Sequence, residues 1–374
     1  MPEIAAIVPY RFLPARSGGR KYIAQFLASL GAKIPIGVLC TVDNDVSGQH
    51  PYRLIPVLKK NVTRYVDPAL YVTARKLIRD RQIKVLIIEH PYLGWLGWLL
   101  KKTCGVKLFV HSHNIEAFRF RSLRKWWWPV LLAYERWVHV QADFSFFIQQ
   151  EDRELAIRKF GLNPALTDVI TYGIDWNQPP STAEKAAARH YLQETHGLQT
   201  DDKIILFTGA FNYQPNLDAL RLITEVINPA LLQLASFNYK ILVCGKDVPG
   251  PMLKAPPSGI IYTGFVQHIE PYYRGADLFI NPVTEGGGIK TKLVEALASD
   301  LTCVSTARGA VGVDPALCNG KLLICGDGAG DWAAFIAKLL DAPGVESPIG
   351  HPFFHQFYWD NITNKALEHI HKYA

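Results

Sequence analysis

Apolar and polar residues follow one pattern along the chain, and the pattern occurs twice. In residues 1–176, short runs rich in Val, Ile and Leu alternate with stretches whose apolar residues recur at helical spacing. The runs predicted to form strands are Ile4–Val8, Ile34–Leu39, Val85–Ile88, Leu108–Val110, Phe144–Ile148 and Val169–Thr171, and the predicted helices are Gly19–Leu30, Pro68–Arg81 and Arg124–Val138. Continuous apolar strands between helices are typical of a parallel sheet covered on both faces.

A second round of the pattern follows a polar stretch, Asn177–Thr182, which contains a Pro-Pro pair. Its predicted strands are Ile204–Thr208, Lys240–Val243, Ile260–Thr263, Leu278–Asn281, Thr302–Ser305 and Lys321–Cys325, and its predicted helices lie near Asn216–Leu234, Thr291–Ala298 and Trp332–Leu340. We therefore expect an α/β protein with Rossmann-like domains at 1–176 and 177–355. Residues 356–374 are expected to form a helix that crosses back to the first domain. The default ligand site is the cleft between two such domains.

The net charge of +7 is unevenly distributed. Residues 1–180 hold 25 Lys and Arg against 14 Asp and Glu, whereas residues 181–374 hold 15 against 19. A basic half can face nucleic acid, anionic lipid or a phosphorylated substrate. No zinc-finger spacing, RNP-type aromatic motif or Lys/Arg tract accompanies it, so we do not expect nucleic acid as a partner.

The cysteines and the apolar runs bear on the compartment. The chain has six cysteines, which stand singly and mostly inside apolar runs. They predict buried thiols in a reducing compartment, and residues 1–14 lack the pattern of a secretion signal. No apolar run reaches the roughly 18 to 20 residues of a membrane-spanning helix. These features predict a cytoplasmic protein.

A glycine-rich turn in the second half is the strongest candidate for a binding site. A predicted buried strand ends at Asn281-Pro282, three glycines follow at Gly286–Gly288, and a helix opens near Thr291. Glycine lets a ligand approach the backbone, and a helix N-terminus offers N–H groups to an anion. An ordinary strand-to-helix turn is the alternative.

Charged residues near this turn suggest which ligand it binds. Lys290 and Lys292 add positive charge for a phosphate, and Glu295 stands one turn inside the helix. A carboxylate at that place can accept hydrogen bonds from two ribose hydroxyls, as acidic residues do in other nucleotide-binding folds.

The residue order of this stretch resembles the donor-binding signature of glycosyltransferase family 4, whose members are retaining enzymes with the GT-B fold. One subgroup has three glycines, two basic positions and then a Glu followed by Ala, a bulky residue and Ala, as here. Phe207–Asn216 is similar to the opening strand and loop of the family's second domain, and Tyr262–Val266 followed by Pro271–Asp277 is similar to its base-binding segment. The resemblance implies donor-binding roles for Gly209, Asn216, Val266, Gly287, Gly288, Lys290, Lys292 and Glu295.

The chain departs from the family pattern at two places. The family usually has two glutamates with seven residues between them, but Gly287 stands eight residues before Glu295. Glu285 is the nearest carboxylate that could reach the sugar. The family also commonly has an Arg and a Lys in the loop 209–216, and here that loop contains neither. The resemblance then leaves Lys290, Lys292 and backbone amides to neutralise the diphosphate.

Two segments of the first half are also similar to family elements. Gly18 and Gly19 follow the first predicted strand, as in the family's N-terminal glycine loop, although any strand-to-helix turn favours glycine. His113–Glu116 matches a His-Asn-aliphatic-Glu element of the same subgroup. His113 could hydrogen-bond the transferring sugar, and Glu116 could hold an acceptor hydroxyl or cap a helix. His111 is a further candidate, and a structural histidine is the alternative for both histidines.

The segment Phe118–Trp137 mixes Arg and Lys with a run of three tryptophans. Such a helix can lie in the headgroup layer of an anionic membrane. The alternative is a helix that packs on the sheet through residues 129–133, with its basic ends in solvent. The aromatic and basic pattern favours peripheral membrane contact.

Together, these features predict a retaining glycosyltransferase that moves a sugar from a nucleoside-diphosphate donor to a hydroxyl of a glycan or lipid-linked acceptor. His113, Glu116 and Glu285 are the predicted catalytic residues. No Asp-x-Asp pair lies in a suitable loop, so no essential metal and no cofactor besides the donor are expected. A nucleotide-sugar epimerase and a catalytically silent binding module are the alternatives. A nicotinamide dehydrogenase is disfavoured because no GxGxxG follows the first strand.

Overall fold

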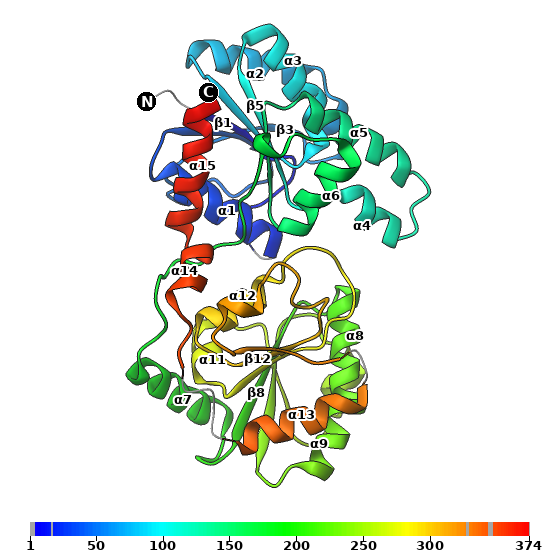
Figure 1. The fold of residues 1–374 in the computed structure, drawn as a ribbon, viewed down its shortest axis with the longest axis vertical. Helices are drawn as coiled ribbons and strands as arrows, with labels where there is room; N and C mark the ends of the chain where they lie inside the picture. Colours follow the sequence, from blue (N-terminus) through cyan, green and yellow to red (C-terminus); the bar gives the residue numbers. More distant parts are fainter. Residues whose placement is uncertain (1–3, 16–17, 327–328, 343–346, 374) are drawn as a thin grey trace. The chain divides into compact units, whose positions relative to one another are not determined.

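The computed structural model describes residues 4–15, 18–326, 329–342 and 347–373. The chain forms two compact units, Met1–Asp175 with Gln356–Ala374, and Trp176–His355 (Figure 1). Each unit holds a parallel β-sheet with helices on its faces. The predicted α/β fold with two Rossmann-like domains is therefore confirmed.

Seven parallel strands form the sheet of the first unit in the described part of the chain, in the order β3-β2-β1-β4-β5-β6-β7. The strands are β1 (Ile4–Ile7), β2 (Ile36–Thr41), β3 (Arg53–Leu58), β4 (Val85–Glu89), β5 (Lys107–Ser112), β6 (Phe144–Phe147) and β7 (Thr167–Val169). β4 pairs with β5 in a register that places Glu89 opposite His111. Because the strands run parallel, the side chains at their carboxyl ends gather at one edge of the sheet.

Helices cover both faces of this sheet. The helices of the first unit are α1 (Gly18–Gly31), α2 (Ala69–Asp80), α3 (Gly94–Cys104), α4 (Glu116–Ser122), α5 (Trp128–Gln141), α6 (Gln150–Phe160) and α15 (Trp359–Tyr373). α2, α3 and α5 bury apolar residues against one face, where Val110 of β5 lies. The next residue of β5, His111, points to the opposite face and contacts Phe26 of α1. Strand alternation thus directs a histidine toward α1.

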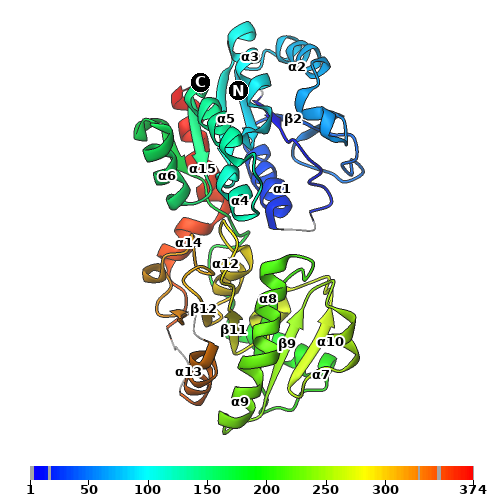
Figure 2. The same cartoon turned by 90° about the vertical axis from the view of Figure 1, so that its right-hand side faces the viewer.

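The C-terminal helix α15 belongs to the first unit and lies beside α1 (Figures 1 and 2). The ring of Trp359 is 3% exposed and lies 5.5 Å from the ring of Tyr22. Lys365 and His369 both contact the carboxylate of Asp168 on β7, at 2.7 Å each. Apolar contacts and ion pairs therefore hold the last helix on the first sheet.

The sheet of the second unit has six parallel strands among the described residues, in the order β10-β9-β8-β11-β12-β13. They are β8 (Lys203–Thr208), β9 (Tyr239–Cys244), β10 (Ile260–Gly264), β11 (Leu278–Asn281), β12 (Cys303–Ser305) and β13 (Leu322–Ile324). The helices are α7 (Thr182–His196), α8 (Gln214–Leu222), α9 (Asn228–Leu234), α10 (Gly250–Lys254), α11 (Glu270–Gly275), α12 (Thr291–Ala298), α13 (Ala329–Asp341) and α14 (His351–Phe357). α8, α9 and α13 bury their apolar residues in one core with the sheet, while α11 and α12 contact strands β8 and β12.

The structure differs from the predicted elements at several places. The predicted helix Arg124–Val138 starts only at Trp128, because Arg124 has a φ of +54°, outside the helical region. α4 precedes it as a separate helix. The edge strand β3 was not predicted, because it is half-exposed and contains Pro56, which an edge strand tolerates.

Six further helices, α3, α6, α7, α10, α11 and α14, were also missing from the prediction. α7 has a sequence signal that was overlooked: Ser181 accepts a hydrogen bond from the N–H of Glu184, whose side chain bonds back to Ser181. By contrast, the helix predicted near Asn216–Leu234 is present, and a π-helical segment, Ile223–Ile227, joins its parts α8 and α9.

Among the described residues, no helix combines the length and apolar composition needed to cross a bilayer.

The contact between Gly173 and Trp359 leads to a stability prediction. A Cβ added at Gly173 would lie 2.4 Å from Cδ2 of Trp359, so Gly173→Ala must displace the indole. We expect the free energy of unfolding of the first unit to fall by about 1–3 kcal/mol, measured by urea denaturation followed by tryptophan fluorescence.

The control is Gly19→Ala in α1, where a Cβ meets no atom within 4 Å. Alanine should raise the stability there by about 0.5–1 kcal/mol, because glycine is a poor helix former. Equal effects of the two substitutions would contradict the packing of Trp359 on Gly173.

Candidate functional site

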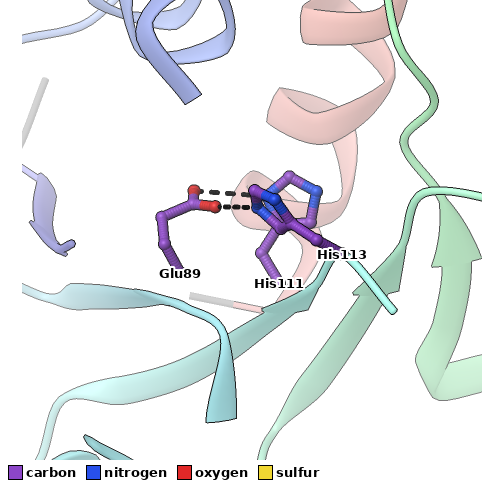
Figure 3. Close-up of side chains that lie close together, drawn as sticks. All are labelled: Glu89, His111 and His113. Carbon is purple, nitrogen blue, oxygen red and sulfur yellow. Dashed lines mark hydrogen bonds and ion pairs between the residues drawn. The ribbon is translucent and has the colours of Figure 1, made fainter. Parts of the chain in front are cut away.

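A cluster of ionisable side chains lies at the carboxyl ends of β4 and β5 in the first unit. Figure 3 shows the carboxylate of Glu89 facing two imidazole rings, with one contact to each ring. Its Oε1 lies 3.2 Å from Nδ1 of His111, and its Oε2 lies 2.6 Å from Nε2 of His113. All three side chains are almost fully buried. The sequence predicted His113 and offered His111, but the carboxylate that joins them was missed.

Burial and charge set the protonation of this cluster. Burial alone would raise the pKa of Glu89, but the charge of His111 and the hydrogen bonds from His111 and His113 outweigh it and hold the pKa well below its usual range. Burial lowers the pKa of His113, although Glu89 opposes this shift. Glu89 is therefore a carboxylate and His113 a neutral imidazole at neutral pH.

His90 follows Glu89 and has a backbone φ of +64°, which is unusual for a residue with a side chain. Its ring lies against that of His113, with centroids 4.1 Å apart, and its Nε2 lies 2.7 Å from the hydroxyl of Tyr10. Its Nδ1 is buried without a hydrogen-bond partner in the described chain and lies 3.9 Å from Oε1 of Glu116. Strained polar residues of this kind concentrate at functional sites. The polar pair Glu89-His90 after an apolar strand was the signal that could have revealed them.

Glu116 begins α4, and its side chain is buried beside this cluster. The side chain does not cap its own helix. Instead, the two carboxylate oxygens of Glu135 on α5 accept the N–H groups of Glu116 and Ala117, each at 2.9 Å. Burial raises the pKa of Glu135 to about 8, which the two N–H donors oppose. Glu116 is thereby free to pair with Arg119 and to accept a hydrogen bond from Asn114.

The glycine loop of the first unit is described only in part. Gly18 and Gly19 form the first turn of α1, and space is open around Gly19. The preceding residues of the predicted loop, Arg16 and Ser17, lie outside the described residues.

In the second unit, the glycine turn connects β11 to α12, as predicted. Gly286 and Gly288 have φ values of +90° and +74°, in the left-handed region that favours glycine. Lys290 folds back over the turn, and its Nζ donates to the carbonyl oxygens of residues 286, 287 and 288 at 3.3, 3.3 and 2.8 Å. The turn therefore holds a cation against its own backbone.

Lys292 extends from α12 to the carboxyl end of the neighbouring strand β8. Its Nζ donates to the carbonyl oxygen of Thr208 at 3.1 Å and to Oδ1 of Asn216 at 3.2 Å. It lies 4.5 Å from the ring centroid of Phe207. A cation from the helix thus stands beside the loop 209–216, which has none of its own. Burial lowers the pKa of Lys292 to about 7 and that of Lys290 to about 8.

Close packing of the backbone supports this lysine site. A Cβ at Gly245, which follows β9, would lie 1.7 Å from the carbonyl oxygen of Gly209, so only glycine fits there. Asn216 donates through its amide to the carbonyl oxygen of Ala210, which fixes the Oδ1 that Lys292 contacts. Gly209, Asn216 and Lys292 are therefore brought together.

The other predicted site residues of the second unit are Glu295, Val266 and Glu285. Glu295 is buried, and its Oε2 accepts a hydrogen bond from the hydroxyl of Tyr273 at 3.5 Å. Val266 is half-buried just beyond β10. Glu285 is exposed, and the structure joins neither Glu285 nor Val266 to the lysine site.

Two further features of the structure have the form of a ligand site. A cavity of about 750 Å³ lies beside α7 and α11, and its basic residues are neutralised by ion pairs such as Lys185 with Asp300 at 3.0 Å. In the part of the chain that the structure describes, Glu89, His111 and His113 form the only group with three potential metal-binding atoms within 4.8 Å. Hydrogen bonds already engage these atoms. The expectation of no essential metal stays a prediction.

The comparisons with known proteins agree with this geometry. Residues 16–178 match the model "Glycosyltransferase Family 4", and residues 202–342 match the model "Glycosyl transferases group 1". The chain is similar to the D-inositol 3-phosphate glycosyltransferase of Rhodococcus jostii, with 26% identity over 76% of this chain and 65% of the relative. It is also similar to an Escherichia coli α-1,3-galactosyltransferase, with 20% identity over 67% and 64%. The chain spans just under two thirds of the length of these curated relatives.

Solved structures share the fold over the whole chain. Sucrose-phosphate synthase from Thermosynechococcus elongatus has a TM-score of 0.74 at 17% identity and covers 100% of this chain and 99% of its own. Anabaena HepE in complex with UDP and glucose has a TM-score of 0.72 at 14% identity, with both chains fully covered. Because glycosyltransferase family models match residues 16–178 and 202–342 in succession and these structures match the whole chain, the protein combines a glycosyltransferase family 4 domain and a glycosyl transferase group 1 domain in the GT-B fold.

Proposed function

We propose that the protein transfers a sugar from a nucleoside-diphosphate donor to a hydroxyl group of a glycan or lipid-linked acceptor, with retention at the anomeric carbon. The second unit binds the donor, and the first unit contributes His113 and Glu116 toward the sugar and the acceptor. The observation that carries the proposal is the pair of half-buried lysines at the glycine turn, whose ammonium groups are held by carbonyl and amide oxygens. A cation partly withdrawn from water gains from a partner of opposite charge, and a diphosphate offers that charge.

The lysine site answers one departure from the family pattern, the absence of cations from the loop 209–216. The cations absent from the loop 209–216 are replaced by Lys292, which reaches that loop from α12. Lys290 lies on the glycine turn itself. Both can neutralise the leaving diphosphate, which is the largest charge that develops in the reaction. In this proposal Glu295 accepts hydrogen bonds from the ribose hydroxyls, and retention rests on the resemblance to family 4.

UDP is the first nucleotide to test as the donor's leaving group, because Anabaena HepE is a structural neighbour that was solved with UDP and with UDP-glucose. One structural neighbour, the UDP-GlcNAc 2-epimerase of Neisseria meningitidis, has a TM-score of 0.61, so the fold alone does not separate transfer from epimerisation. The acceptor is proposed to lie at an anionic membrane surface, with the protein cytoplasmic and peripheral.

An exposed apolar patch with basic residues supports the membrane proposal. Leu123, Trp126 and Val130, at the α4–α5 connection, are 54%, 85% and 69% exposed. Arg121, Arg124 and Lys125 are exposed among them. α5 does pack on the sheet, but through later residues, whereas residues 129, 130 and 133 remain exposed. Leu132 packs against a buried cluster, as the alternative expects, so α5 combines a packed face with an exposed one at residues 129, 130 and 133.

A turnover assay tests the proposed function. With UDP-, GDP- and ADP-sugars, we expect release of the nucleoside diphosphate from one donor class and, with an acceptor, a product of retained anomeric configuration by NMR. Glu295→Gln should weaken donor binding by about 1.5–3 kcal/mol, because a charged acceptor for ribose is lost. Return of an epimerised sugar on the same nucleotide, or binding without turnover of any donor, would contradict the proposal.

The lysine site makes a separate prediction for diphosphate binding. Lys290→Met and Lys292→Met should each weaken the nucleoside diphosphate by about tenfold or more and the nucleoside hardly at all, measured by calorimetry. Affinity for the diphosphate should fall as the pH rises from 7 to 9, because lysines with pKa values of about 7 and 8 lose the protons that binding requires. The Lys292→Met variant should show a weaker pH dependence.

The matched control is Lys338→Met, at an exposed lysine of α13. This substitution should change neither the affinity for the nucleoside diphosphate nor the affinity for the nucleoside. Equal losses for diphosphate and nucleoside would indicate a damaged loop and count against a diphosphate site. A diphosphate affinity that rises toward pH 9 would exclude these lysines as its ligands.

Vesicle flotation tests the membrane proposal. Binding should be stronger to phosphatidylglycerol-containing vesicles than to pure phosphatidylcholine and should fall at high salt, because salt screens the attraction. Changing Arg121, Arg124 and Lys125 together to Glu should weaken binding by at least about tenfold, since each base near the surface contributes about 1 kcal/mol. The same charge change at Lys159, Lys254 and Lys338, which are exposed on other elements, should have a smaller effect. Equal effects, or no dependence on lipid charge, would contradict the proposed surface.

A further inference from the structure

Hydrogen-bond directions determine where the protons lie around His111. Tyr22 of α1 has one hydroxyl hydrogen, and the carbonyl oxygen of Ile170, 2.7 Å away, can only accept it. The hydroxyl oxygen of Tyr22 must then accept from Nε2 of His111, 2.8 Å away. His111 therefore carries a hydrogen on Nε2.

The other nitrogen of His111 faces the carboxylate of Glu89. One proton must lie between Nδ1 of His111 and Oε1 of Glu89, because two lone pairs at 3.2 Å would repel each other. That proton belongs on His111, because the charge of His111 and the hydrogen bonds from the two histidines hold the pKa of Glu89 well below its usual range, and the adjacent carboxylate offsets the burial of the imidazolium. His111 and Glu89 thus form a buried imidazolium–carboxylate pair.

The second oxygen of Glu89 fixes the tautomer of His113. With Glu89 anionic, Oε2 can only accept, so Nε2 of His113 is the protonated nitrogen at 2.6 Å. His113 is neutral, and its Nδ1 keeps a lone pair. Among the described residues, no group forms a hydrogen bond with this Nδ1. The atom is also absent from the set of buried polar atoms without a partner, so it remains accessible to solvent.

We propose that Glu89 is a positioning residue, which holds His113 as the Nε2–H tautomer so that Nδ1 accepts a hydrogen bond from a hydroxyl group of the sugar or acceptor. His111, fixed by Tyr22, supplies the positive charge that keeps Glu89 an acceptor. The inference rests on the proposed function for the role of the hydroxyl group, but the tautomer itself does not depend on it. The ring of His113 also lies against His90, which in turn contacts Tyr10 and Glu116. The experiment below leaves these three residues unchanged.

The tautomer is measured on the full chain without any ligand. Long-range ¹H–¹⁵N NMR of the imidazole rings should show His113 protonated at Nε2 only and His111 protonated at both nitrogens. In Glu89→Gln, the amide oxygen can still accept from His113 and the amide nitrogen can donate to His111, so the His113 tautomer should persist while His111 becomes neutral. In Glu89→Leu, His113 should lose its single tautomer.

A wild-type His113 protonated at Nδ1, or at both nitrogens, would overturn the proposal. Stoichiometric divalent metal by elemental analysis, with imidazole signals that change on chelation, would also overturn it, because a metal would then occupy the place of the protons. Glu89→Gln keeps the test decisive if the leucine variant fails to fold.

Turnover of the nucleotide sugar identified by the release assay supplies the second readout. Glu89→Leu should lower kcat by on the order of 10- to 100-fold with little change in the donor KM, and Glu89→Gln should restore most of it. The double variant Glu89→Leu/His113→Asn should be no slower than His113→Asn alone, because both act through one ring. Additive losses would overturn the positioning role. If no donor is turned over, the proposed function fails, whereas the NMR result still decides the tautomer.

Discussion

Parallel strand pairing is the constraint on which both candidate sites depend. In a parallel sheet, every strand delivers its last side chain to the same edge, so residues far apart in sequence meet there. The pairing of β4 with β5 places Glu89 opposite His111, and the pairing of β8 with β11 places the glycine turn beside Thr208. A one-residue shift in either register would turn these side chains to the opposite face of the sheet.

Each site buries charge at this edge and compensates for it differently. In the first unit, the compensation is internal: Glu89 lies between two histidines, and Glu135 satisfies two backbone N–H groups at the start of α4. In the second unit it is incomplete, because Lys290 and Lys292 are held by carbonyl and amide oxygens and hydrogen-bond to no carboxylate in the described part of the chain. This contrast fits a preformed polar site in the first unit and a site that awaits an anion in the second.

The position of Lys292 shows how a positive charge can reach the carboxyl end of β8 from another element of the fold. Here it comes from α12, 84 residues after Thr208, and its side chain reaches back across the pair β8–β11. The structure thus provides a positive charge beside the loop 209–216, and a linear motif does not reveal it.

The sequence by itself determined the two rounds of parallel strands and the boundaries of elements such as β11 and α12, because continuous apolar strands and the glycine turn are local signals. It also indicated His113, Lys290 and Lys292. It missed β3, whose half-exposed residues lack the apolar run, and α7, whose capping box was overlooked. Only the tertiary structure placed Glu89 between His111 and His113, and Lys292 on Asn216, because these contacts join residues from different strands and helices. Strand register and long side chains decide such contacts, and neither leaves a periodic trace in the sequence.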